Sequence, residues 1–184
     1  MHLLGRPAPE AVRDSAFSRF LFRSPLMAPL WLVLRVVIGW QWLSSGWEKV
    51  TGSGWVGSGA GTAVTEFLKA ALKKAGGEMP DVQPWFARFI ESVALPNAEL
   101  FSYLVTFGEL AVGAALILGL LTGLAAFFGL LMNLVYLWAG TLSTNPTLVA
   151  AAVLLILAWR VAGWWGLDRV VLPRLWGTER SRVS

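Results

Sequence analysis

The sequence predicts an all-α fold, a polytopic membrane four-helix bundle, and three features of its composition support this. Hydrophobic residues make up 56% of the 184 residues, and the mean hydropathy of +0.62 is above that of an ordinary soluble domain. Charged residues are only 14% of the chain and cluster outside the long apolar runs. Many of the 11 tryptophans stand near the ends of those runs, where indoles sit at the headgroup level of a bilayer. These are Trp31, Trp47, Trp55, Trp138, Trp164, Trp165 and Trp176.

Four apolar runs are long enough to cross the hydrocarbon core, which takes about 20 residues of helix. Pro29 fits the first turn of the first run, and Pro146 fits the first turn of the fourth. Asn97 is a suitable N-cap for the second run, with Glu99 in its first turn. The spans are expected at about residues 27–47, 98–120, 123–142 and 146–165, within a transmembrane domain over residues 25–167.

A long insertion, residues 48–96, separates the first two spans. It begins with a glycine-rich stretch that is expected to be a flexible linker, because no Gly-Lys-Ser/Thr follows to make a phosphate loop. Two short amphipathic helices are expected after it, at Thr65–Ala75 and about Trp85–Val93, the second lying on the membrane surface.

The charge distribution predicts the orientation in the membrane. The tails, residues 1–24 and 168–184, each carry four arginines, and such basic flanks favour the cytoplasmic side. Both termini are therefore expected in the cytoplasm and the insertion outside, in a bacterial or archaeal cytoplasmic membrane. The net charge of +4 is explained by these tails and by contact with anionic membrane lipids, so nucleic acid is not expected as a partner.

Several cofactors are excluded by composition. The chain has no cysteine, which excludes a dithiol centre, an iron–sulfur cluster and c-type haem attachment. Its one histidine, His2, lies in the polar N-terminal tail, which excludes bis-histidine haem and a histidine metal site inside the bundle. No haem, metal or iron–sulfur cluster is predicted.

Three polar residues lie inside apolar spans, where burial is costly: Arg35, Glu109 and Asn133. Each shares a helical stripe with small and polar residues, and such stripes face other helices in lipid. An unpaired charge at this depth costs about 2.5–3.5 kcal/mol, so Arg35 and Glu109 are expected to pair. The stripes serve either a structural ion pair, a polar pocket for a quinone head or small anion, or a proton path. The residues that share the three stripes are Gly39, Trp42, Gly46 and Lys49; Ser102, Thr106 and Gly113; and Ala126, Gly129, Tyr136 and Gly140.

A family resemblance rests on three motifs. Residues 35–49, Arg-Val-Val-Ile-Gly-Trp-Gln-Trp-Leu-Ser-Ser-Gly-Trp-Glu-Lys, resemble the first-helix signature of the DoxX/DoxD family. Residues 108–113 with 118–123 are similar to its second and third helices, and Gly-Leu-Asp-Arg at 166–169 is a typical ending. The likeness covers about residues 26–175. It implies a four-helix membrane fold and directs attention to Arg35, Gly39, Gly46, Lys49, Glu109 and Gly113.

The resemblance also implies a function. The DoxD branch supplies a membrane subunit of thiosulfate:quinone oxidoreductases, and other members are associated with redox and sulfur-stress complexes. Thiosulfate is then expected to be oxidised at the outer face, with membrane quinone as electron acceptor and a second subunit or second copy of the chain as partner. The alternative is a non-catalytic scaffold or assembly subunit of such a complex; a small-solute transporter is less favoured, because the spans are not broken and show no inverted repeat.

The site residues follow from these expectations. Lys49 provides a cation for a dianion, and Glu109 a buried proton carrier. The expected pocket opens to the outer leaflet or face beneath the glycine-rich segment and the Trp85–Val93 helix. The candidate catalytic residues are Glu109, Arg35 and Lys49; the candidate substrate- or quinone-binding residues are Trp42, Gly46, Trp47, Asn133 and Tyr136, with Trp55 as a further wall.

Overall fold

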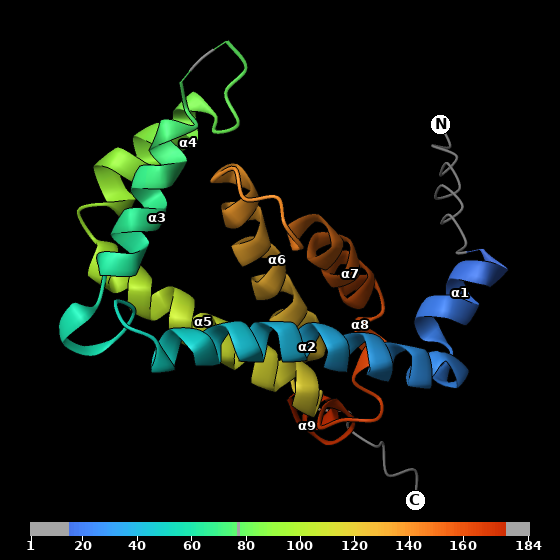
Figure 1. Ribbon diagram of the computed structural model, residues 1–184. Coiled ribbons are helices and arrows are strands. Elements are labelled where there is room, and N and C mark those ends of the chain that lie inside the picture. Colours follow the sequence, from blue (N-terminus) through green and yellow to red (C-terminus); the bar gives the residue numbers. More distant parts are fainter. Residues whose placement is uncertain (1–14, 77, 176–184) are drawn as a thin grey trace, which may run out of the picture.

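The computed structural model describes residues 15–76 and 78–175, and in these residues every regular element is helical (Figure 1). The prediction of an all-helical chain is confirmed over this range. The elements are α1 (Ala16–Arg23), the 3-10 turn η1 (Pro25–Met27), α2 (Ala28–Thr51), η2 (Gly57–Gly59), α3 (Thr62–Lys73), α4 (Pro84–Phe89), the π-helical turn η3 (Ile90–Ala94), α5 (Ala98–Leu118), α6 (Thr122–Trp138), α7 (Asn145–Leu157), α8 (Trp159–Ala162) and α9 (Asp168–Leu175).

Two of the four expected spans are long, apolar helices in the structure. The segments Pro25–Thr51 and Ala98–Leu118 are long and apolar enough to cross a membrane, whereas α6 and α7 are apolar but shorter. The third span ends at Trp138, before the expected 142, because Gly140 has a φ of 70° and turns the chain. The fourth helix is interrupted at Ala158, where the Val161 N–H donates to the Ala158 carbonyl in a tighter turn.

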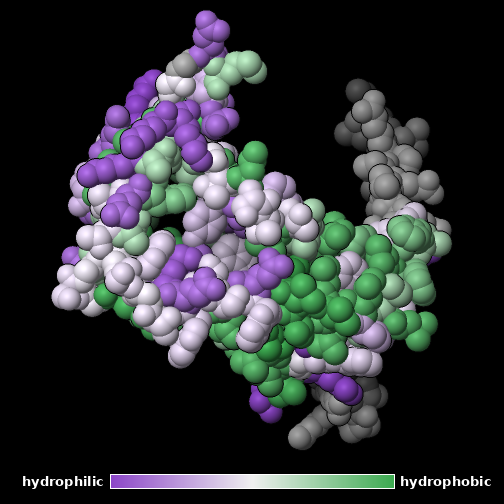
Figure 2. All heavy atoms as spheres, viewed as in Figure 1, coloured by the Kyte–Doolittle hydropathy of each residue, from purple (hydrophilic) through white to green (hydrophobic). Residues whose placement is uncertain are grey.

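The insertion folds into a small cap, residues 52–97, over one end of the bundle. Figure 1 shows α3 beside α4 at the C-terminal end of α2, and Figure 2 shows hydrophilic residues gathered over this part. The predicted amphipathic helices are present, and their apolar faces pack against each other and against the N-terminal end of α5. A separate hydrophobic core joins the cap to the adjoining ends of α5 and α6, formed by Val64, Leu68, Ala71, Val82, Phe86, Ile90, Ala94, Ala98 and Ala139.

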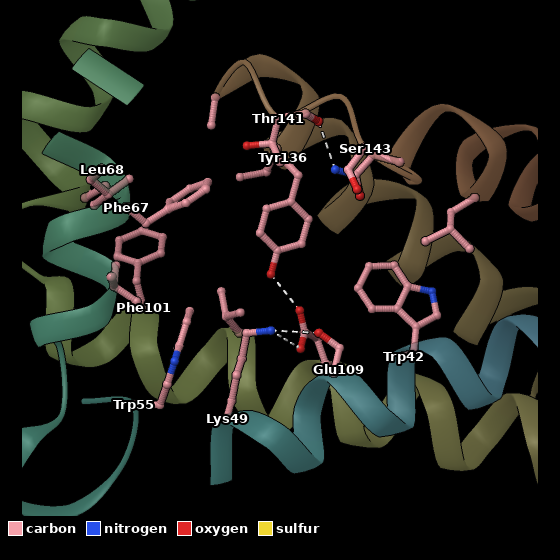
Figure 3. A pocket seen from close by; sticks show the side chains of 18 of the residues that line it. Trp42, Lys49, Trp55, Phe67, Leu68, Phe101, Glu109, Tyr136, Thr141 and Ser143 are labelled. Atoms are coloured by element: carbon pink, nitrogen blue, oxygen red, sulfur yellow. Dashed lines mark hydrogen bonds and ion pairs between the residues drawn. The ribbon is translucent and has the colours of Figure 1, made fainter. Parts of the chain in front are cut away.

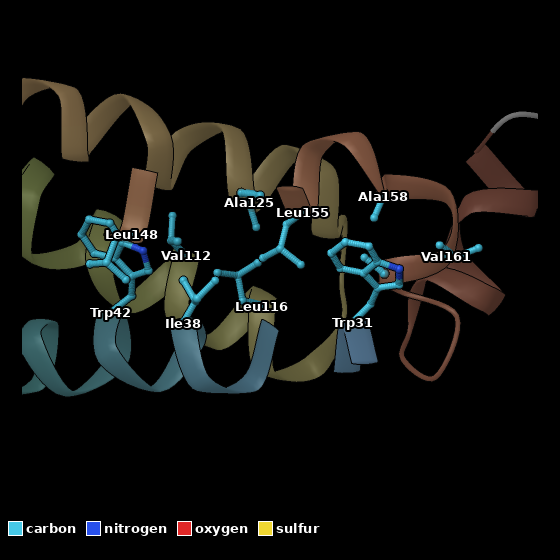
Figure 4. Close-up of a cluster of buried hydrophobic side chains, with 12 residues drawn as sticks. Trp31, Ile38, Trp42, Val112, Leu116, Ala125, Leu148, Leu155, Ala158 and Val161 are labelled. Atoms are coloured by element: carbon cyan, nitrogen blue, oxygen red, sulfur yellow. The ribbon is translucent and has the colours of Figure 1, made fainter. Parts of the chain in front are cut away.

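The bundle is organised around the crossing of α2 and α5, where glycines let the two backbones meet. A Cβ at Gly113 would collide with the backbone of Leu43, and one at Gly39 would lie 2.9 Å from the Gly113 carbonyl oxygen. Small residues at helix contacts are typical of membrane bundles, where close backbone packing supplies the attraction. Beside this crossing runs a second hydrophobic core that reaches from Trp42 to Trp31 along α2 (Figure 4).

The three predicted polar stripes all face the protein interior. Arg35, Glu109 and Asn133 are 1%, 1% and 0% exposed, respectively. In contrast, the opposite face of α2 is apolar and exposed, which fits contact with lipid. This outward face carries Leu30, Val33, Val37, Trp40 and Trp47.

We expect Gly113→Ala to destabilise the protein by about 1–3 kcal/mol, because its methyl group would meet the backbone of α2 and overpack the crossing. The matched control on the same helix is Gly108→Ala, whose Cβ would lie 3.3 Å from the flexible Met132 Sδ. Thermal unfolding in detergent measures the stability of both variants. Equal stability of the two variants would contradict a backbone contact at Gly113.

Candidate functional site

A cavity of about 370 Å³ lies between the cap and the ends of α2, α5 and α6 nearest to it (Figure 3). Its size is within the range of small-molecule sites. The polar side chains Lys49, Glu109 and Tyr136 form one side, and aromatic residues of the cap and α5 face them (Figure 3). The other lining residues are Gln41, Trp42, Ser45, Trp55, Val64, Phe67, Leu68, Phe86, Phe89, Ala94, Phe101, Val105, Val135, Ala139, Thr141, Ser143, Thr144, Asn145 and Leu148.

Glu109 is the centre of a hydrogen-bonded triad that joins three helices. Its Oε2 accepts from Lys49 Nζ at 2.7 Å, and its Oε1 accepts from Tyr136 Oη at 2.6 Å. Lys49 also donates to Ser45 Oγ at 2.8 Å. The bonds to ionised groups are short, as expected for charge-assisted hydrogen bonds. Because Glu109 is 1% exposed, this pairing is what allows its charge to be buried.

The helix crossing places these groups at one level. Gly46 packs directly on Leu110, with a Cβ-equivalent position 2.9 Å from the Leu110 backbone nitrogen. Lys49 lies three residues beyond Gly46 on α2, and Glu109 precedes Leu110 on α5. The ammonium and the carboxylate therefore come within hydrogen-bonding distance, and Tyr136 reaches Glu109 from α6.

The wall opposite the triad is aromatic. The Phe67 ring meets the Tyr136 ring edge to face at 6.0 Å, and Phe89 meets Phe101 at 6.1 Å. Lys49 Nζ lies 4.9 Å from the centre of the Trp55 ring, a cation–π contact. A ligand with a flat apolar body and a polar end matches this division between an aromatic wall and a charged wall.

The family of the chain is established by comparison with known protein families. The DoxX family model matches residues 30–142, which is more than half of the sequence. The chain belongs to the DoxX family. It is accordingly a membrane protein of the DoxX/DoxD type. Neither the curated proteins nor the solved structures contain a match to it.

The DoxX match includes all three members of the triad, and the structure brings together several of the predicted site residues. Trp42, Lys49, Glu109 and Tyr136 line one cavity with Trp55, beneath the cap. From the segments expected to cover the pocket, Trp55, Phe86 and Phe89 line the cavity, and the binding of a ligand there stays a prediction.

Three predicted binding residues lie outside this cavity. Gly46 is buried in the contact with Leu110, so it sets the spacing of helices rather than leaving room for a ligand. Trp47 is 62% exposed on the outer face of α2. Asn133 is fully buried, and neither of its side-chain polar atoms has a hydrogen-bond partner.

The predicted pairing of Arg35 with Glu109 is wrong, because Arg35 lies near the other end of α5. Its guanidinium donates to the carbonyls of Leu116 and Ile117 at 2.7 and 2.8 Å and to that of Trp165 at 2.8 Å. The last carbonyls of a helix have no partner within it, and Arg35 satisfies two of them. In this DoxX protein, Arg35 therefore lies outside the cavity lining and joins α2 to the end of α5 and to the C-terminal segment.

Asp168 accepts hydrogen bonds at the start of α6, as Arg35 donates them at the end of α5. Its carboxylate accepts from the backbone N–H groups of Leu121 and Thr122, which lack partners within the helix. Arg35 and Asp168 together tie α2, the α5–α6 turn and the C-terminal segment. This explains the Gly-Leu-Asp ending of the family resemblance: a Cβ at Gly166 would lie 2.8 Å from Gly119 Cα, so the two turns pack backbone to backbone.

Apart from Trp55, the sequence did not predict the aromatic cap residues of the cavity or its polar α6–α7 turn. Phe67 and Leu68 lie on a helix that the sequence predicts only as amphipathic. The apolar face of that helix was the available signal for them. The turn residues Thr141 and Asn145, bonded through Asn145 Nδ2 and the Thr141 carbonyl at 2.9 Å, gave no signal beyond a helix start.

A double-mutant cycle measures the coupling energy between Lys49 and Glu109. Lys49→Met leaves the buried Glu109 carboxylate without its cation, and we expect a loss of about 3 kcal/mol in unfolding free energy, against little change for the exposed Lys69→Met. Adding Glu109→Gln to Lys49→Met should restore much of the loss, because no charge is then left unpaired. Strictly additive effects would show that the two groups are not coupled.

Proposed function

We propose that this protein binds a membrane quinone in the cap cavity and acts as a component of a quinone-linked oxidoreductase. The observation that carries the proposal is the Lys49–Glu109–Tyr136 triad on one wall of an aromatic cavity of about 370 Å³. A quinone head combines a flat ring with polar carbonyl oxygens, which is the chemistry that these two walls recognise.

Donors are available for a carbonyl oxygen. Two of the three ammonium hydrogens of Lys49 are directed to Glu109 and Ser45, which leaves one for a ligand. The Tyr136 hydroxyl can turn from Glu109 to the ligand while the carboxylate keeps its bond to Lys49. Trp42 and Phe101 flank the space on either side of the triad (Figure 3).

Reduction of a quinone consumes two electrons and two protons. Glu109 touches both Lys49 and Tyr136, so a proton held by either donor can be replaced through one carboxylate. The role of Glu109 is then to hold and pass protons at the carbonyl end, in a site that its two partners keep charged and ordered.

Thiosulfate is the proposed electron donor, with the balance 2 S₂O₃²⁻ + quinone + 2 H⁺ → S₄O₆²⁻ + quinol. Among the described cavity-lining residues, Lys49 is the only cation, and Glu109 already neutralises it. A dianion is therefore poorly matched to the cavity itself. Thiosulfate is expected to react at the outer face, beyond the cap, or on a partner subunit.

The proposed topology has four spans, with the cap outside the bacterial or archaeal cytoplasmic membrane and both termini in the cytoplasm. The basic tails and the hydrophilic cap support this arrangement. The natural sequence has no cysteine, so single cysteines at Ser58 and Arg174 give a clean test with a membrane-impermeant thiol reagent. Labelling of intact cells is expected at 58 only, and labelling at 174 instead would reverse the orientation.

One observation favours the alternative of a non-catalytic scaffold. Both carboxylate oxygens of Glu109 are satisfied inside the protein, which is also what a purely structural polar network requires. Quinone binding separates these functions, because a scaffold has no need for it.

Tyr136→Phe should weaken binding of a short-chain quinone about tenfold or more, since it removes a hydroxyl donor beside the ligand. The chain has two tyrosines, and the second provides the control: Tyr103 lies outside the cavity lining, with its hydroxyl accepting from the Gly57 N–H. Tyr103→Phe should bind as the unchanged protein does. Thermal stabilisation by menadione or decylubiquinone measures affinity, and equal binding by both variants would refute the site.

The rate of thiosulfate-dependent quinone reduction by the same preparations distinguishes a catalytic protein from a scaffold. Glu109→Gln should lower thiosulfate-dependent quinone reduction by about a hundredfold while reducing binding far less. Quinone binding without thiosulfate oxidation would retain the cavity assignment and exclude thiosulfate as donor to this chain alone. No quinone binding by the folded protein would leave the scaffold as the function.

A further inference from the structure

The end of the bundle opposite the cap carries two adjoining hollows around α8 and α9. The first, of about 370 Å³, is lined by Trp159, Arg160, Gly163, Trp164, Asp168, Arg169, Leu172 and Pro173. The second, of about 440 Å³, is lined by Leu121, Thr122, Gly123, Leu124, Phe127, Ile156, Trp159, Asp168 and Leu172. They share Trp159, Asp168 and Leu172, so they form one continuous surface, with a basic hollow at one end and an apolar groove at the other.

The basic hollow presents two cations at the level of two indoles. Arg160 lies over the Trp159 ring at 5.1 Å, and Arg169 lies over the Trp164 ring at 5.7 Å. Stacking on an indole holds the plane of a guanidinium while leaving its N–H edge free to donate. Within the described residues, neither arginine forms an ion pair with a carboxylate.

The one acid among the described lining residues, Asp168, forms no salt bridge with either arginine. It is 3% exposed, and its two oxygens accept from the backbone N–H groups of Leu121 and Thr122. Two arginines thus stand against this one carboxylate, whose oxygens are both engaged at the start of α6. The hollow keeps an excess of positive charge among its described residues, and it is suited to an anion.

The adjoining groove is suited to hydrocarbon. Leu124 and Phe127 on α6 are 51% and 45% exposed, and Ile156 on α7 lines the same groove. A free anion such as phosphate would use only the basic hollow and would leave this apolar surface uncovered. A ligand that joins an anionic head to an acyl chain covers both.

We propose that this surface is a specific site for an anionic phospholipid, with the phosphate between Arg160 and Arg169 and one acyl chain along Leu124 and Phe127. Arginine recognises phosphate through paired N–H donors, and basic pockets between membrane helices bind anionic headgroups. The tryptophans fit the same depth, because indoles favour the boundary between headgroups and hydrocarbon. This site is separate from the cap cavity, and it does not depend on the proposed quinone chemistry.

Native mass spectrometry of the full chain tests the proposal with phosphatidylglycerol and phosphatidylethanolamine of equal chain length. The unchanged protein should retain phosphatidylglycerol at least fivefold better. The double variant Arg160→Gln/Arg169→Gln should lose this preference. The matched control is Arg88→Gln/Arg174→Gln, which removes the same charge from two exposed arginines outside both hollows and should keep it.

Two results would overturn the proposal. Equal retention of phosphatidylglycerol by the two double variants would show that net charge, not this site, attracts the lipid. Competition by inorganic phosphate or by chain-free glycerophosphoglycerol as strong as that by the lipid would show a simple anion site. Size-exclusion profiles identical to that of the unchanged protein establish that the variants are folded, and a misfolded Arg169→Gln is replaced by Arg169→Lys, which should bind more weakly than the unchanged protein.

Discussion

The contact between α2 and α5 sets the geometry of the whole interior. Gly39, Gly46 and Gly113 have no side chains to hold the two helices apart, so the backbones come into contact along residues 39–46 of α2. In lipid the hydrophobic effect does not drive helices together, and such contacts must supply the attraction through close packing. The level at which each polar side chain lies then follows from this one crossing.

The crossing separates the two buried charges that might have neutralised each other. Near the cap it brings Lys49 to Glu109; at the far end it brings Arg35 to the open carbonyls of α5. The charge of Glu109 is balanced by Lys49, and that of Arg35 by backbone carbonyls together with the nearby carboxylate of Asp168. The protein therefore places its structural fastening and its ligand-sized cavity at opposite ends of the same two helices.

The sequence was sufficient to predict where polar groups are buried, but not which groups they meet. Arg35, Glu109 and Asn133 were recognised from their stripes, because helical spacing alone decides which residues share a face. The partner of Arg35 could not be predicted in this way, since it is a set of backbone carbonyls that exist as acceptors only once α5 ends at Leu118. Gly46, a candidate binding residue by its sequence, lies instead in a helix contact, because a missing side chain is compatible with either empty space or close packing and only the neighbouring helix decides between them.

A hydrogen bond holds the cap to the bundle above the cavity. Lys74 Nζ donates to the Gly140 carbonyl at 2.8 Å, and this bond ties the end of α3 to the turn after α6. Inside, Lys49 keeps one hydrogen for a ligand, whereas the Tyr136 hydroxyl must leave Glu109 to reach one. The polar contacts therefore supply only part of the affinity, and covering the aromatic wall supplies the rest. Burial of that apolar surface gives the association a negative heat-capacity change.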